Sequence, residues 1–193
     1  ADALLASKTP MIWAGAGVLF SGSSDALKEL SQLTSIPVFC TMPGKSGFDE
    51  RDPLSLGSGC GTTTLMAHEW LKDSDVILAL GSSLTRSPYA QAIPKGKILI
   101  QNTNNPDDIN KDESIQISLV GDTKLTIDQL IKTIKKKTKN KGFGDLEKIA
   151  SKIKAIKESW LAEWHGSLNS EEEPITYYRV IEEINKNLDL ENS

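Results

Sequence analysis

"MIWAGAGVLFSG", residues 11–22, determines the fold class, because it reads as an apolar strand that runs directly into a glycine turn. Such a turn often brings the backbone close to a phosphorylated ligand, since glycine permits close approach and a following helix offers unpaired N–H groups. A tight corner without any ligand explains a single turn of this kind equally well. Both interpretations stay open at this position.

The rest of the chain alternates between strand-like and helix-like patterns. Apolar positions recur at helical spacing after Ser24, after the "GTTT" of residues 61–64 and after Asp122, a good N-cap residue. Strands that alternate with helices form βαβ units, so the fold class is α/β, with a parallel sheet that helices cover on both faces. Short apolar runs predict five strands, at residues 11–15, 37–41, 76–80, 97–101 and 115–120.

The composition changes near residue 134, where "KTIKKKTKNKG" (132–142) carries six lysines in eleven residues. A solvated helix end and linker is the simpler interpretation, and a contact with a phosphorylated ligand or another domain is the alternative. Beyond it, an apolar stripe from Leu146 to Trp164 predicts an amphipathic helix. We expect a further helix to begin with Pro174 near its first position.

Composition argues against several functional classes. The net charge of −4 gives no indication of nucleic-acid binding, and no apolar run approaches the roughly 18–20 residues of a membrane span. Cys40 and Cys60 match no zinc or redox spacing, and such sparse cysteine use fits a cytoplasmic protein. Neither end resembles a natural terminus, so we expect the chain to be part of a longer protein.

Catalytic and phosphate-binding motifs fail when they are tested one by one. Phe20 occupies the third glycine place of a dinucleotide fingerprint, and Phe39 stands where a P-loop needs its first glycine. His68 and His165, together with two scattered cysteines, cannot assemble a convincing zinc site. We therefore expect neither catalytic residues nor a metal site.

Small-residue turns follow most of the predicted strands. In an open parallel sheet, ligands bind outside the carboxyl ends of the strands, so several such turns at one edge favour a binding site more than a single turn does. The turns lie at residues 15–17, 41–47, 57–62, 81–87 and 102–108.

The order of five motifs resembles the central domain of thiamine-diphosphate-dependent enzymes, the group of acetohydroxyacid synthase, oxalyl-CoA decarboxylase, benzoylformate decarboxylase and pyruvate oxidase. The resemblance covers residues 1–135, and residues 136–193 resemble the helical linker that leads toward a C-terminal diphosphate-binding domain. The motifs are "KTPMIWAGAGV" (8–18), "IPVFCTMPGKSGFDERDPLSLGSGCGT" (36–62), "LKDSDVILALGSSL" (71–84), "KILIQNTNNPDDINK" (97–111) and "SLVGDTKLTIDQLI" (118–131).

This resemblance implies a three-layer α/β/α fold with a five- or six-stranded parallel sheet, similar to the NAD/FAD-binding fold of deoxyhypusine synthase. A sixth strand would lie at a sheet edge. In the family, thiamine diphosphate and magnesium are bound by the N- and C-terminal domains, through an activating glutamate and a Gly-Asp-Gly…Asn motif. Here Thr123 follows Gly121–Asp122 and Leu146 follows Gly144–Asp145, so the motif is missing.

The chain itself is therefore expected to be inactive. The resemblance implies that the parent is a decarboxylase or carboligase, an acetolactate-synthase-like transferase or lyase that acts on a 2-keto acid or acyl-CoA. Its partners would be the two missing domains, in a homodimer or homotetramer. The alternative is a stand-alone nucleotide-binding module of the sirtuin or electron-transfer-flavoprotein type, although sirtuins usually carry four zinc-binding cysteines and this chain has two.

Some family members hold FAD or ADP in this domain. Two departures weaken that expectation here. Ser83 stands where flavin-binding members usually carry arginine, with Arg86 as a nearby substitute. Thr103 and Asn105 stand at the places aligned with the acidic residues that hold a ribose in such members. A nucleotide-binding domain and a purely structural domain both stay open. By resemblance, the ligand-facing positions are Gly15, Ala16, Gly17, Thr41, Met42, Gly59, Cys60, Gly61, Gly81, Ser82, Ser83, Arg86, Thr103 and Asn105.

Overall fold

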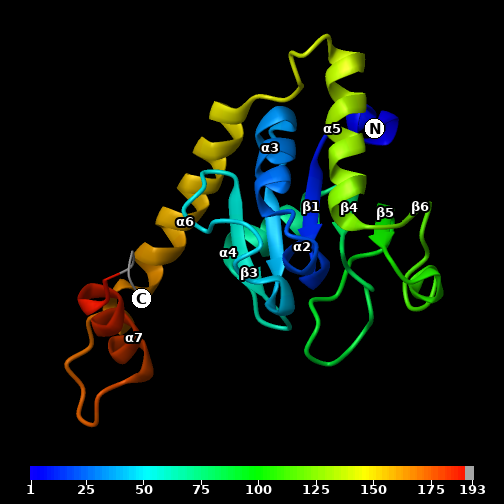
Figure 1. The fold of residues 1–193 in the computed structure, drawn as a ribbon. Helices are drawn as coiled ribbons and strands as arrows, with labels where there is room; N and C mark the ends of the chain where they lie inside the picture. Colours follow the sequence, from blue (N-terminus) through cyan, green and yellow to red (C-terminus); the bar gives the residue numbers. More distant parts are fainter. Residues whose placement is uncertain (190–193) are drawn as a thin grey trace. The chain divides into compact units, whose positions relative to one another are not determined.

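The computed structural model describes residues 1–189 and divides into two compact units, residues 1–154 and the part from residue 155 onward. The first unit contains a six-stranded parallel sheet in the order β3-β2-β1-β4-β5-β6, with helices on both faces (Figure 1). The predicted α/β class and three-layer architecture are confirmed. The strands are β1 (Pro10–Ala14), β2 (Val38–Thr41), β3 (Ser55–Gly59), β4 (Val76–Leu80), β5 (Ile98–Thr103) and β6 (Ile117–Val120).

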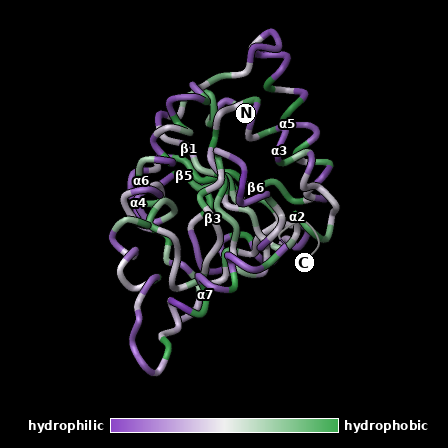
Figure 2. Tube along the Cα trace, turned by 90° about the vertical axis from the view of Figure 1, so that its left-hand side faces the viewer, coloured by the Kyte–Doolittle hydropathy of each residue, from purple (hydrophilic) through white to green (hydrophobic). Residues whose placement is uncertain are grey.

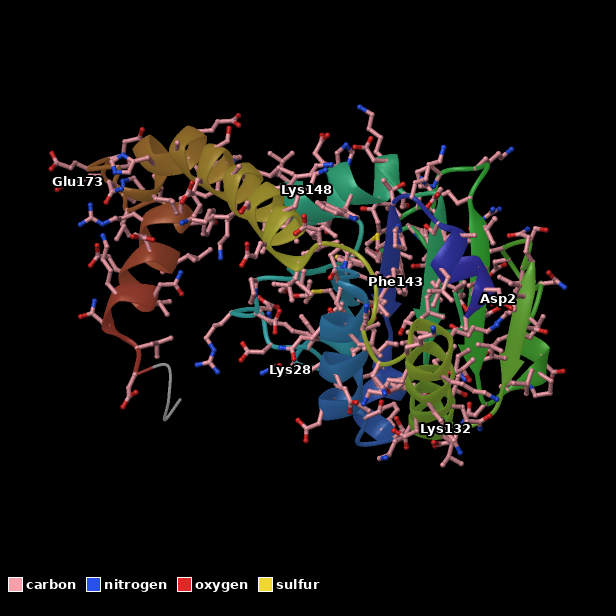
Figure 3. The ribbon with its side chains drawn as sticks, turned by 90° about the horizontal axis from the view of Figure 1, so that it is seen from above. Asp2, Lys28, Lys132, Phe143, Lys148 and Glu173 are labelled. Atoms are coloured by element: carbon pink, nitrogen blue, oxygen red, sulfur yellow. The ribbon has the colours of Figure 1, made fainter. Side chains whose placement is uncertain are left out.

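Two helices cover one face of the sheet and one helix covers the other. Seen along the strands, α3 and α5 lie on one side and α4 lies on the opposite side (Figure 3). Shorter helices complete the first unit. The bounds are α1 (Asp2–Ala6), α2 (Ala16–Phe20), α3 (Ser24–Thr34), α4 (Leu65–Asp73) and α5 (Thr123–Thr138), with 3-10 turns η1 (Met42–Gly44) and η2 (Pro106–Asp108).

The core follows from the apolar central strands. All five residues of β4 are buried, as expected for a strand with helices on both faces. Figure 2 shows these apolar strands in green at the centre of the tube. On the face of α3 and α5, Leu27 and Ile127 are completely buried. On the other face, the rings of Trp13 and Phe39 pack edge to face, with 4.9 Å between their centroids.

The sequence prediction missed β3, the edge strand beside β2. Its sequence "SLGSG" contains one large apolar residue, Leu56, and small residues that have little intrinsic preference for strands. Tertiary contacts stabilise it instead, because the Thr64 hydroxyl donates to the Leu56 carbonyl at the start of α4. Residues 57–59, which we expected in a turn, therefore belong to the strand.

Helix α5 begins where the sequence predicts. The Asp122 carboxylate accepts a hydrogen bond from the Leu125 backbone N–H at 2.9 Å, which caps the helix. Residue 135, the expected end of the domain, lies inside this helix, and the first compact unit extends to Lys154.

The long helix α6 (Leu146–Leu168) begins in the first unit and continues into the second. In the first unit Ile153 is 4% exposed, and the Lys152 ammonium lies 4.6 Å from the ring centroid of Trp70 in α4. The Lys152 contact attaches this part of the helix to α4. The preceding turn packs elsewhere, because Leu146 and Ile149 lie against the core cluster that contains Leu27 and Ile127.

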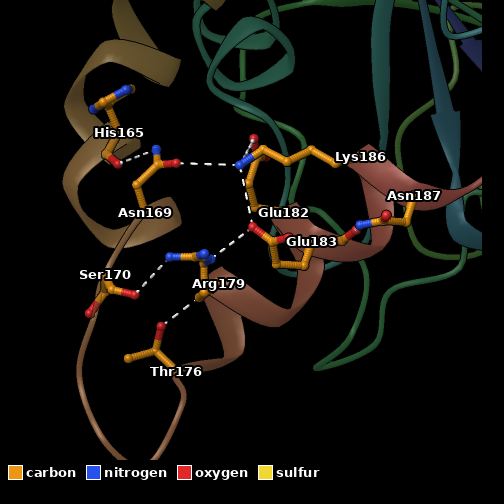
Figure 4. A network of polar contacts seen from close by, with 9 residues as sticks. All are labelled: His165, Asn169, Ser170, Thr176, Arg179, Glu182, Glu183, Lys186 and Asn187. Carbon is orange, nitrogen blue, oxygen red and sulfur yellow. Dashed lines mark hydrogen bonds and ion pairs between the residues drawn. The ribbon is translucent and has the colours of Figure 1, made fainter.

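The second unit contains the end of α6 and α7 (Tyr177–Asn187). Thr176 accepts a hydrogen bond from the Arg179 N–H, and the Arg179 guanidinium donates to Glu183 and to the Ser170 carbonyl (Figure 4). Because the Thr176 hydroxyl provides the cap, the helix starts three residues later than the expectation from Pro174.

Over residues 1–189, no helix has both the length and the apolar character that a membrane span requires.

Candidate functional site

The carboxyl ends of the central strands open onto a cleft of about 890 Å³. Its apolar walls come from Trp13 in β1 and from Leu84, Tyr89 and Ile93 in the connection between β4 and β5. Ten of the fourteen predicted ligand-facing residues line it: Gly15, Ala16, Thr41, Met42, Gly59, Cys60, Gly81, Ser82, Ser83 and Arg86.

A smaller recess of about 310 Å³ lies beside this cleft and shares Ala16 and the 81–83 turn with it. Gly17 and Thr103 line the recess and not the large cleft. Gly61 and Asn105 line neither. The structure thus brings ten of the predicted positions together in the cleft and two in the adjoining recess, and it leaves Gly61 and Asn105 outside both.

Gly15 and Gly17 pack directly against Gly81. The Gly17 N–H donates to the Gly81 carbonyl at 2.9 Å, and a Cβ atom on Gly17 would lie 2.6 Å from the Gly81 Cα. A Cβ atom on Gly15 would collide with the carbonyl oxygen of Gly81 as well. These glycines allow the backbones of the turns after β1 and β4 to come into contact. Packing therefore requires a tight turn at residues 15–17, and Gly15 and Ala16 in this turn also line the cleft.

Arg86 is already engaged by acidic neighbours. Its Nε and Nη2 atoms donate to the two Glu113 carboxylate oxygens at 2.8 and 3.1 Å, and its backbone N–H donates to Asp112. The Glu113 carboxylate raises the pKa of the guanidinium. A bidentate pair of this kind fixes the arginine in place, so two of its three nitrogens point at Glu113 and not at a ligand.

The two thiols differ in acidity because their surroundings differ. A hydrogen bond from the Thr62 backbone lowers the pKa of Cys60, which lies at the cleft. Burial raises the pKa of Cys40 to about 11. Cys60 is therefore the more acidic of the two, and the buried Cys40 is inert.

Sequence reasoning missed Asp108 and Glu113. The Thr103 hydroxyl donates to Asp108 at 2.8 Å, so a carboxylate does lie at the recess beside β5, three residues after the aligned Asn105. Glu113 comes from the connection before β6, lines the cleft and pairs there with Arg86. The acidic "PDD" and "KDE" runs were the available signals.

The cleft has the size and the lining of a small-molecule site. The cleft volume lies in the usual range for small-molecule sites, and its apolar walls and the hydroxyls of Ser82 and Ser83 suit a ring with a polar tail. No Gly-Asp-Gly motif is present in the sequence. Among residues 1–189, no group of three or more His, Cys, Asp or Glu side chains is placed to hold a metal ion.

Comparisons with known proteins place this geometry in a family. The family model described as the central domain of thiamine pyrophosphate enzymes matches residues 1–130. The "Probable acetolactate synthase large subunit" of Methanococcus aeolicus is 32% identical over 133 residues, which are 68% of this chain and 22% of that protein. The pyruvate oxidase of Lactiplantibacillus plantarum is 24% identical over 183 residues, which are 95% of this chain and 29% of that protein.

The solved structure of the benzoylformate decarboxylase from Polynucleobacter necessarius shares the fold. Its TM-score is 0.57 with 23% identity, over 68% of this chain and 25% of that one. The chain spans between 22% and 31% of the length of the curated relatives it matches. The family match covers the whole sheet of the first unit, and on that ground the chain belongs to the thiamine pyrophosphate enzyme family, as its central domain.

Proposed function

We propose that this chain is the non-catalytic central domain of a thiamine-diphosphate-dependent decarboxylase or carboligase that acts on a 2-keto acid or acyl-CoA. The observation that carries the proposal is the match of residues 1–130 to the central-domain model. The relatives named acetolactate synthase and pyruvate oxidase support the class of the parent enzyme. The stand-alone sirtuin or flavoprotein module receives no support from these relatives.

In this proposal the chain supplies a scaffold and leaves the chemistry to its neighbours. Thiamine diphosphate provides the electron sink for the carbanion when it is bound in the parent enzyme. This chain lacks the motif that holds the diphosphate and magnesium. Its own residues build a rigid sheet whose carboxyl edge faces a cleft, and the N- and C-terminal domains would pack around it in a dimer or tetramer.

An activity assay tests this division of labour. The purified chain, supplied with pyruvate, thiamine diphosphate and magnesium, is expected to form neither carbon dioxide nor acetolactate. A complete acetolactate synthase in the same assay is the positive control. Measurable turnover by the chain alone would contradict the proposal, because it would require catalytic residues that the family places in the other two domains.

A second function, binding of ADP or of the adenine half of FAD, is favoured by one specific observation. Ten positions that the family resemblance marks as ligand-facing line a single cleft. Trp13, Leu84 and Tyr89 offer apolar surface to a ring, and Gly59 and Cys60 also line the cleft. Arg86 contributes less than the resemblance implies, since Glu113 holds it.

Thermal unfolding with added nucleotide tests the binding function. ADP or FAD is expected to raise the melting temperature in proportion to the logarithm of its excess over the dissociation constant. Ser83→Glu places a negative charge in the cleft and should remove the shift, whereas Ser151→Glu, an exposed position on α6, should keep it. If millimolar nucleotide does not change the melting temperature of the wild-type chain, the binding function is wrong and only the structural role remains.

A further inference from the structure

The connection between β4 and β5, residues 81–97, forms no helix or strand although it joins neighbouring strands. Connections between helices and strands in compact domains have a median length of about 4–6 residues. Connections longer than about 12–15 residues that form no helix or strand usually serve a function. Figure 1 shows this green segment extending beyond the carboxyl ends of β4 and β5. From Ser82 to Lys95 it supplies one wall of the cleft.

The root of this connection is fixed. The Gly81 and Ser82 N–H groups donate to the side chain and carbonyl of Asn102, and the Gln101 amide donates to the Ser82 carbonyl. Leu84 is 8% exposed. The connection therefore leaves β4 in a defined direction, and any movement begins after Leu84.

Three contacts then tie the connection to opposite sides of the cleft. The Arg86–Glu113 pair and the hydrogen bond from the Arg86 N–H to Asp112 attach it to the segment before β6. The Tyr89 carbonyl accepts a hydrogen bond of 2.7 Å from the Gly61 N–H after β3. β3 and β6 are the two edge strands of the sheet. The connection thus spans the mouth of the cleft from one side to the other.

Little holds the segment beyond Tyr89. The Ala90 N–H donates to Ser87 and the Gln91 amide donates to Ala92, so both hydrogen bonds are local. Firm attachment resumes at Lys97, whose ammonium donates to the carbonyls of Lys72 and Ser74. Just before it, Gly96 has φ +86° and open space around its Cα, which suits a hinge.

We propose that residues 85–96 form a flap over the cleft, which the Arg86–Glu113 ion pair and the Gly61–Tyr89 hydrogen bond hold closed. Leu84 is its fixed root and Gly96 its hinge. When the ion pair is released, only the hydrogen bond from the Arg86 N–H to Asp112 holds the flap on the β6 side. Loss of the ion pair also loosens the Gly61–Tyr89 hydrogen bond, because the short segment between Arg86 and Tyr89 joins the two sides. The flap regulates access to the proposed nucleotide site, on which its purpose rests, but its motion requires no nucleotide.

Hydrogen exchange of the whole chain without nucleotide tests the flap, so its failure is distinct from a failure of nucleotide binding. Glu113→Gln removes the charge at constant shape and is expected to speed exchange roughly three- to tenfold, both in residues 85–96 and at the Gly61 amide. The matched control, Asp128→Asn, breaks the Lys124–Asp128 surface pair and should leave both regions unchanged. Faster exchange near Arg86 with an unchanged Gly61 amide would overturn the concerted flap.

A second measurement needs no variant and covers the case in which Glu113→Gln does not fold. Raising sodium chloride to about 1 M reduces the Debye length to about 3 Å and weakens the partly exposed Arg86–Glu113 pair. Exchange in residues 85–96 and at Gly61 should rise relative to amides of β4, which serve as the internal reference. Equal behaviour of the flap and β4 amides across this salt range would overturn the proposal.

Discussion

Gly17 and Gly81 lie in contact through their backbones, and this contact joins the ends of two neighbouring strands. Any side chain on Gly17 must displace the Gly81 backbone, which has φ +59° and is bonded to Asn102. The residue is therefore required by packing before any ligand is considered. A loss of nucleotide affinity on substitution of Gly17 would not identify it as a ligand contact.

We predict that Gly17→Val lowers the free energy of unfolding by about 1–3 kcal/mol, the usual cost of overpacking. Urea unfolding followed by tryptophan fluorescence measures it. Gly166→Val is the control, because a Cβ atom there meets nothing within 4 Å. Wild-type stability of Gly17→Val would mean that the two turns do not touch as the structure shows.

Asp75 fastens the segment before β1 to the segment before β4. Burial alone would raise the pKa of its carboxyl group, but hydrogen bonds from the Ser7 hydroxyl and from the Lys8 and Thr9 N–H groups outweigh burial and lower the pKa to about 2. Because the folded pKa lies below the ordinary value of 3.8 for an aspartate, the stabilisation is fully present above about pH 4 and is lost as the pH falls toward 2.

We predict that Asp75→Asn lowers the free energy of unfolding at neutral pH by at most about 2 kcal/mol, and that the difference from wild type shrinks between pH 4 and 2. Denaturant titrations across this pH range measure it. The exposed neighbour Asp73→Asn is the control and should show a small difference. A difference for Asp75→Asn that stays constant down to pH 2 would contradict this assignment.

At the scale of elements, helix α5 shows which boundaries a sequence specifies. Asp122 precedes an apolar face at helical spacing, and its carboxylate caps the helix as predicted. Strand β4, continuously apolar, was equally predictable. β3 was not, because Ser55, Gly57 and Gly59 carry no strand signal and the contact with Thr64 that supports the strand is tertiary.

We predict that Asp122→Ala lowers the free energy of unfolding by about 1 kcal/mol, since the Leu125 N–H loses its partner. The comparison variant is Asp128→Ala in the same helix, which loses an exposed i,i+4 pair with Lys124 that contributes little to stability. Chemical denaturation of both variants gives the order. A larger loss for Asp128→Ala would show that the cap contributes little.

At the scale of the whole molecule, the sequence predicted that turns would gather at one edge of the sheet, but not how these turns connect. Turns after parallel strands must meet at one edge, so a cleft at that edge follows from the strand order. The partner of Arg86 does not follow, because Glu113 lies in another connection and only the folded sheet brings them together. The role of Gly17 escaped prediction for the same reason: Gly81, which it touches, is distant in sequence.

The extent of the first unit gives the last prediction. The sequence places the end of the domain at residue 135, yet Ile153 is buried and Lys152 packs on Trp70. We predict that residues 1–154 unfold in one cooperative transition with nearly the stability of this unit in the whole chain, and that residues 1–135 are markedly less stable.

In the whole chain, Ile153→Ala should lower the free energy of unfolding by about 2–5 kcal/mol, whereas Ile156→Ala, just beyond this unit, should lower it by less. Equal stability of the two truncated chains, with an unaffected Ile153→Ala variant, would support a domain boundary at residue 135.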